Sequence, residues 1–237
     1  MESDGLAGGN VEGYSMAEEV EQYERIANDG LFPRERTVVE RYFSPGGSVL
    51  DLGCGVGRTT APLAERGFDV VGVDVSGEAI RRARKHFPDL EFEVANAASL
   101  PFSDDAFEYV LFSSFGLDYT YPETQRHRAL EEIGRVLERG GLFAFSSHNT
   151  WYRFPAVVFD HDFLRTFYLD RSNWSRLFSR YKIHPDEHAS FESYFTNPIR
   201  QRRQLRQHGF EPLATVGKRA GVARFLESAP HYVARKV

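Results

Sequence analysis

A strand-like run that ends in three alternating glycines constrains the fold of this chain more than any other stretch. Residues 49–52 are apolar apart from one carboxyl group, and Gly53, Gly55 and Gly57 follow at every second position. An apolar run of this kind predicts a buried strand, and the glycines predict a tight turn in which the backbone comes close to another group. The sequence therefore predicts a strand that ends beside a ligand.

A second predicted strand, over residues 68–73, ends in a carboxylate at Asp74. Gly53 and Asp74 lie 21 positions apart, near the ~20 expected where an acidic residue at the tip of the next parallel strand binds a ribose diol. The loop reads GxGxG, however, and Arg58 stands where a dinucleotide fingerprint has its third glycine. Arginine at this position disfavours close packing on the pyrophosphate of NAD or NADP.

These motifs resemble those of the class I S-adenosylmethionine-dependent methyltransferases, whose first motif looks like VLDLGCGxG and whose second ends in an acidic residue. The resemblance extends from about Pro33 to Leu142, and it includes the stretches 96–102 and 135–142, the latter similar to the family's RVLxxGG segment. It implies a doubly wound, mostly parallel, seven-stranded α/β sheet of the Rossmann-like kind, with S-adenosyl-L-methionine as cofactor. The alternative is a doubly wound domain whose glycine turn is incidental.

The resemblance also implies which residues bind the cofactor. Asp51 would orient the ammonium group directly or through water, and Asp74 would hold the ribose hydroxyls. Asn96 stands where the family usually has an acidic residue at the adenine amine; its amide oxygen can accept the same hydrogen bond without charge assistance. The full predicted set is Asp51, Gly53, Cys54, Gly55, Gly57, Asp74, Val75, Asn96, Ala97 and Ser113.

The acceptor side is predicted at the carboxyl ends of the fourth and fifth strands, where open α/β sheets bind ligands. We expect His148 to be the general base, because an imidazole there could deprotonate a hydroxyl group. Tyr119 is a second catalytic candidate, and Tyr23, Asp118 and Trp151 are substrate-binding candidates. For His148 the alternative is a structural histidine with satisfied hydrogen bonds, and for Tyr23 it is a core position.

The hydrophobic pattern divides the chain into alternating helices and strands. We predict an N-terminal helical region that includes helices over 16–29 and 33–42, and further helices over 59–66, 77–87, 122–137 and 198–208. Strands are predicted over 49–52, 68–73, 90–95, 107–112, 142–147, 211–216 and 231–235. The last two strands are expected to form an antiparallel hairpin that closes the sheet.

Four regions follow from this division: a flexible tail over 1–14, an S-adenosylmethionine-binding domain over 15–148, an insertion over 149–195, and a C-terminal completion of the domain over 196–237. The insertion holds thirteen aromatic residues, including both tryptophans. This density predicts a helical cap over the site rather than an exposed loop. The alternative is that the stretch extends the core.

Composition excludes several classes of function. A formal net charge of -5 disfavours a general nucleic-acid binder. Cys54 is the only cysteine, so it can form no intramolecular disulfide, and a reducing compartment fits. No apolar run approaches the ~18 residues of a membrane span, and we expect a soluble, cytoplasmic protein. His184 and His188 have HxxxH spacing with Pro185 between them, so no metal site is predicted.

Three functions remain open at this stage. The aromatic insertion favours a methyltransferase that acts on an oxygen or nitrogen of a small molecule. The arginines at 200, 202, 203 and 206 are the only support for a protein or RNA acceptor, and such a run is more often a solvated helix face. The third possibility is an adenosine-nucleoside binder without catalytic activity. Nothing in the sequence indicates an oligomeric state.

Overall fold

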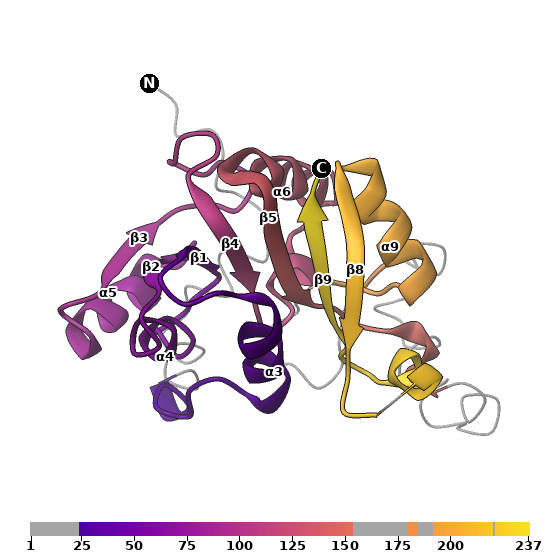
Figure 1. Ribbon diagram of the computed structural model, residues 1–237, viewed down its shortest axis with the longest axis horizontal. Coiled ribbons are helices and arrows are strands. Elements are labelled where there is room, and N and C mark those ends of the chain that lie inside the picture. Colours follow the sequence, from indigo (N-terminus) through magenta and orange to yellow (C-terminus); the bar gives the residue numbers. More distant parts are fainter. Residues whose placement is uncertain (1–23, 154–179, 184–191, 220) are drawn as a thin grey trace.

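The computed structural model describes residues 24–153, 180–183, 192–219 and 221–237. They form a seven-stranded sheet flanked by helices and a separate two-stranded sheet (Figure 1). The order of strands in the large sheet is β3-β2-β1-β4-β5-β9-β8. These strands are β1 Ser48–Leu52, β2 Asp69–Asp74, β3 Glu91–Val94, β4 Phe107–Phe112, β5 Leu137–Ser146, β8 Phe210–Val216 and β9 His231–Lys236.

All neighbouring strands from β3 to β5 pair in parallel, whereas β9 is antiparallel to both β5 and β8. Figure 1 shows β4 and β9 running in opposite directions. The predicted fold class, a mostly parallel doubly wound sheet of seven strands closed by an antiparallel hairpin, is therefore confirmed. Because the parallel strands end at one edge of the sheet, the loops after β1, β2, β4 and β5 meet there.

Helices cover both faces of the sheet. They are α3 Pro33–Tyr42, α4 Thr60–Ala64, α5 Gly77–His86, α6 Glu123–Val136 and α9 Pro198–Gln207, with 3-10 turns η1 Gly116–Tyr119, η2 Thr150–Arg153 and η5 Gly221–Leu226. Side chains alternate along each strand, so Leu50 packs with α6 and α9 in one core layer. Val49 packs with α3 and α4 in the other. No helix in the described residues is long and apolar enough to cross a membrane.

Local signals explain where the helices begin and end. Proline occupies the first position of α3, as predicted. The Ser76 hydroxyl caps α5 by accepting a hydrogen bond from Ala79 N at 3.2 Å. The Asn197 side chain caps α9 by accepting one from Arg200 N at 3.0 Å. Gly209 follows α9 with φ of +78°, a conformation that favours glycine.

The fifth strand begins earlier than predicted. We expected it at 142, but the chain passes from α6 directly into β5, and Leu137 pairs with Phe107. A register shift between Phe107 and Tyr109 absorbs the extra residues of β5 as an irregularity in the ladder. The pairing of Leu137 with Phe107 is long-range, so the local pattern did not predict strand over residues 137–141.

The structure describes only part of the predicted insertion. Its described residues include η2 and a two-stranded antiparallel sheet, β6 Tyr181–Ile183 with β7 Glu192–Tyr194, where we predicted helix. Tyr181 and Tyr194 are directly opposed and their rings meet edge to face, a cross-strand aromatic pair that favours strands. Residues 154–179 and 184–191 lie outside the described part, as do the tail and Tyr23. The cap and the four-region division stay predictions.

Candidate active site

The glycine loop after β1 has the tight backbone that the sequence predicts. Gly53, Gly55 and Gly57 all have positive φ angles, of 70°, 57° and 93°. A Cβ atom at Gly53 would lie 2.8 Å from the ring of Phe112, whereas at Gly55 no atom of the described residues would lie within 4 Å. The loop is therefore packed against the protein at Gly53 and open at Gly55, which leaves room for a ligand beside the Gly55 backbone.

Asp74 joins this loop to the next helix. Its Oδ2 atom accepts a hydrogen bond from Gly55 N at 2.9 Å, and Oδ1 accepts one from Ser76 N at 2.8 Å. Each carboxylate oxygen has a further lone pair, so the same group can accept hydroxyl donors from a ligand. The predicted contact with a ribose stays a prediction, and the structure adds a second role for Asp74 in shaping the loop.

Replacing Asp74 with alanine should weaken cofactor binding at least about tenfold, because charge-assisted hydrogen bonds contribute roughly 1.5–3 kcal/mol each. Calorimetric titration with S-adenosylhomocysteine measures the change. Asp69→Ala is the matched control, since Asp69 is an exposed residue at the start of the same strand and should leave the affinity unchanged. A folded Asp74→Ala protein with wild-type affinity would show that Asp74 does not contact the ligand.

Asp51 is a buried carboxylate with one oxygen unused. The side chain is 1% exposed, and its Oδ2 atom accepts hydrogen bonds from the hydroxyls of Thr59 at 2.6 Å and Thr60 at 2.7 Å. Among the described residues, Oδ1 has no hydrogen-bond partner. Burial raises the pKa of Asp51 to about 6, although both threonine hydroxyls act in the opposite direction. A buried oxygen of this kind fits a cationic donor such as an ammonium group.

The other predicted cofactor residues lie around the same edge. Cys54 is buried, and burial raises the pKa of its thiol well above the usual value, so it is no nucleophile. Ser113, directly after β4, is buried, and its hydroxyl has no partner among the described residues. Asn96 differs from expectation: its amide oxygen accepts a hydrogen bond from Ala98 N at 2.9 Å. An adenine amine would have to share that oxygen. Val75 and Ala97 are half-buried.

His148 lies two residues after the end of β5, inside an aromatic cage. Its ring stacks on Phe115 at 4.1 Å and on Phe195 at 4.7 Å between centroids, and the ring of Tyr119 stands perpendicular to it at 6.2 Å. The two stacked rings cover both faces of the imidazole, and its Nε2 atom is buried. The predicted catalytic pair, His148 and Tyr119, therefore lies together.

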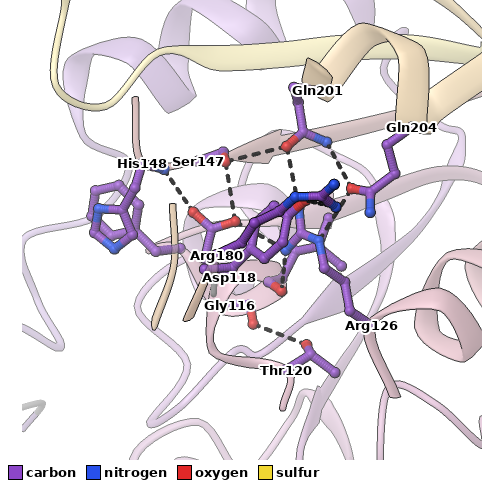
Figure 2. A network of polar contacts seen from close by, with 12 residues as sticks. Gly116, Asp118, Thr120, Arg126, Ser147, His148, Arg180, Gln201 and Gln204 are labelled. Carbon is purple, nitrogen blue, oxygen red and sulfur yellow. Dashed lines mark hydrogen bonds and ion pairs between the residues drawn. The ribbon is translucent and has the colours of Figure 1, made fainter. Parts of the chain in front are cut away.

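Asp118 does not line the rim as we expected. It is fully buried, and its carboxylate accepts hydrogen bonds from the guanidinium of Arg126 at 3.0 Å, the hydroxyl of Ser147 at 3.0 Å and the backbone N of His148 at 2.6 Å (Figure 2). Burial and these three partners disfavour a direct contact of Asp118 with the substrate, and that contact stays a prediction. Trp151 is half-buried in η2, where its backbone N donates to the Asn149 side chain.

Sequence reasoning missed the part that Arg58 plays. Arg58 is buried and forms a two-pronged ion pair with Glu35 of α3, with both N to O distances at 2.8 Å. The guanidinium also donates to the carbonyl of Gly30 and the hydroxyl of Ser114, and it lies over the ring of Phe32. Burial acts to raise the pKa of Glu35, but hydrogen bonds and charge from Arg58 lower it overall. Arg58 therefore ties the glycine loop to the N-terminal segment and to the loop after β4.

The match to known families agrees with this geometry. Residues 49–141, which carry the glycine loop and Asp74, match the family described as "Methyltransferase domain". Residues 49–141 thus match a methyltransferase domain, which agrees with the resemblance to the class I S-adenosylmethionine-dependent methyltransferases and supports S-adenosyl-L-methionine as the cofactor. The open backbone at Gly55, the unused oxygen of Asp51 and the position of Asp74 all fit that group.

The curated proteins similar to this chain include several demethylmenaquinone methyltransferases. A demethylmenaquinone methyltransferase of Renibacterium salmoninarum is 35% identical over 119 residues, which are 49% of this chain and 48% of that protein. The chain thus spans about half the length of the curated relatives it matches. A demethylmenaquinone methyltransferase of Streptomyces avermitilis is 32% identical over 62% of this chain and 65% of its own length.

Solved structures share the fold. An S-adenosylmethionine-dependent methyltransferase from Methanosarcina mazei matches with a TM-score of 0.70 and 22% identity, over 88% of this chain and 99% of that one. The 1,6-didemethyltoxoflavin-N1-methyltransferase of Burkholderia thailandensis, with bound 1,6-didemethyltoxoflavin and S-adenosylhomocysteine, has a TM-score of 0.65 and 18% identity, over 100% and 93% of the two chains. At these identities the likeness shows the fold alone.

Proposed function

We propose that this protein transfers a methyl group from S-adenosylmethionine to an oxygen or nitrogen atom of a small-molecule acceptor, with His148 as the general base. The observation that carries the proposal is the aromatic cage of His148 at the edge of the sheet that also holds the glycine loop. Aromatic walls around a largely enclosed imidazole suit a proton transfer from an acceptor held in an apolar environment.

The cofactor would be held by residues of β1, of the glycine loop after it and of the end of β2. The unused Oδ1 atom of Asp51 would accept from its ammonium group, the backbone at Gly55 would lie against its methionine end, and Asp74 would accept from its ribose hydroxyls. When bound, S-adenosylmethionine supplies an activated methyl group and the leaving group. The protein's part is to align the acceptor, exclude water and accept a proton at His148.

Two names among the similar proteins support a small-molecule acceptor, namely demethylmenaquinone and 1,6-didemethyltoxoflavin methyltransferases. The arginines of α9 do not favour a macromolecule. Arg200, Arg203 and Arg206 are exposed, and Arg202 donates to the carbonyl of Pro212. These positions fit a solvated helix face, which is the more common explanation for such a run of arginines.

Incubating the protein with methyl-labelled S-adenosylmethionine and the small-molecule fraction of a cell extract tests the proposal. We expect label in a small molecule, and His148→Gln should reduce the rate by about 10²–10⁴ while cofactor affinity stays the same, because a general base contributes that much. His86→Gln, which changes a histidine on α5 with a part-exposed side chain, should keep the wild-type rate.

Other outcomes would overturn the proposal in distinct ways. Label in protein or RNA, with none in the small-molecule fraction, would indicate a macromolecular acceptor. Tight binding of S-adenosylmethionine without transfer to any fraction would indicate a binding protein. A His148→Gln protein with full activity would leave methyl transfer in place but remove the base from the mechanism.

A further inference from the structure

A fully buried arginine lies behind the cage of His148. Arg126 of α6 has no exposed surface, and its guanidinium donates to the Asp118 carboxylate at 3.0 Å and to the carbonyl of Leu117. The side-chain oxygens of Gln201 and Gln204 on α9 accept from it at 3.2 Å and 3.1 Å. Figure 2 shows the guanidinium at the centre of this network, with hydrogen bonds to groups of η1 and of α9.

The segments that Arg126 contacts are the ones that build the cage. Its contacts with residues 117–118 of η1 lie just after Phe115, which covers one face of the His148 ring. The guanidinium also lies 4.0 Å from the ring centroid of Tyr194, the residue before Phe195, which covers the other face. Asp118, its counter-ion, binds the backbone N of His148 itself.

Stability alone is a poor explanation for such a group. Removing two ions from water is costly, and replacing a buried ion pair by apolar side chains is often neutral or stabilising. What a guanidinium provides is five donors in a rigid planar fork, which fix the directions of its acceptors. Here those acceptors belong to two separate segments of the chain, η1 and α9.

We propose that Arg126 is a positioning residue that, through Asp118 and Tyr194, holds the imidazole of His148 in the orientation required at the acceptor. The inference rests on the proposed function, because it needs His148 to act on a substrate. The guanidinium fixes both covering rings and the backbone of His148 from one point. A displacement of about 1 Å in a reacting group can reduce a rate on the order of 100-fold.

The test uses the double variant Arg126→Met with Asp118→Asn, which removes both charges and leaves no unpaired ion. Label transfer from methyl-labelled S-adenosylmethionine to the small-molecule extract fraction should fall on the order of 100-fold, with unchanged affinity for S-adenosylhomocysteine. Leu130→Ala is the matched control: Leu130 is fully buried on the same helix, so it loses stability through packing, and its transfer rate should stay near wild type while the protein is folded.

Amide hydrogen exchange provides a readout that needs no acceptor. In wild type the His148 amide should exchange slowly because the Asp118 carboxylate accepts its hydrogen bond. In the double variant it should exchange faster, because the acceptor is then a neutral amide oxygen that no guanidinium holds in place. The amide of Phe145 in β5 should stay protected in both proteins. In a His148→Gln background, the double variant should reduce label transfer no further, because the groups act as one unit.

The outcomes distinguish a failure of the proposed function from a failure of the positioning role of Arg126. If wild type transfers no label, the proposed function fails, and the exchange of the His148 amide still shows whether the pair holds that segment. If wild type transfers label and the double variant transfers it equally fast, or if the His148 amide stays protected without the pair, Arg126 does not position His148. If the double variant regains the wild-type transfer rate under conditions that restore its thermal stability, the pair has a structural role only.

Discussion

Replacing Glu35 with alanine is expected to destabilise the protein by about 3–5 kcal/mol, because it leaves Arg58 buried without its counter-ion. Arg58 has 7% of its side chain exposed and Glu35 has 3%, and two hydrogen bonds at 2.8 Å join them. Urea unfolding measures the change in the free energy of unfolding. Affinity for S-adenosylhomocysteine should fall as well, since Arg58 belongs to the glycine loop.

A control on the same helix separates the pair from general effects on α3. Glu40 is exposed in α3, so Glu40→Ala should change the free energy of unfolding by no more than about 0.5 kcal/mol. The double variant Glu35→Met with Arg58→Met should recover much of the lost stability, because neither charge stays unpaired. Similar losses in Glu35→Ala and Glu40→Ala would contradict this account.

Replacing Asp51 with asparagine should change how stability depends on pH. The folded pKa of about 6 lies above the usual value of 3.8, so between pH 4 and pH 6 folded Asp51 keeps a proton that the unfolded chain has released. Raising the pH therefore destabilises wild type through this group. Relative to Asp51→Asn, wild type should lose about 2 kcal/mol of unfolding free energy between pH 4 and pH 8.

The ionisation of Asp51 should also be detectable when the cofactor binds. If the ammonium group of S-adenosylmethionine meets Oδ1 of Asp51, binding near pH 6 favours the ionised form and releases a proton. Calorimetry in buffers of different ionisation enthalpy counts that proton, and Asp51→Asn should release none. Equal proton release by both proteins at pH 6 would place the ammonium group away from Asp51.

Much of the fold follows from local signals in the sequence. The bounds of α3 and of β4 agree with prediction to the residue, because a proline at the start of a helix and an apolar run bounded by polar residues act over short distances. The start of β5 could not be predicted in the same way. It depends on the pairing of Leu137 with Phe107, thirty positions earlier, which no local pattern encodes.

In the candidate site, too, local motifs were predictable and contacts between residues distant in the sequence were not. The motif places the glycine loop and Asp74 at one edge of the sheet, and the strand pattern places His148 there. The buried ion pair of Glu35 and Arg58 could not be predicted from the sequence, because the two residues are 23 positions apart and no spacing rule links them. Asp118 looked like a rim residue for the same reason: its partner Arg126 becomes a partner only when α6 folds back over η1.

The antiparallel strand β9 has a consequence for how the protein is made. It supplies the second edge of β5, and the ribosome adds it after every other described strand of the large sheet. A nascent chain can pair β1 to β5 in parallel while one side of β5, with its stacked rings of Phe143 and Phe145, still lacks a neighbour. Completion of the sheet thus waits for β9, and a chain that stops before His231 presents an open edge on which other chains can aggregate.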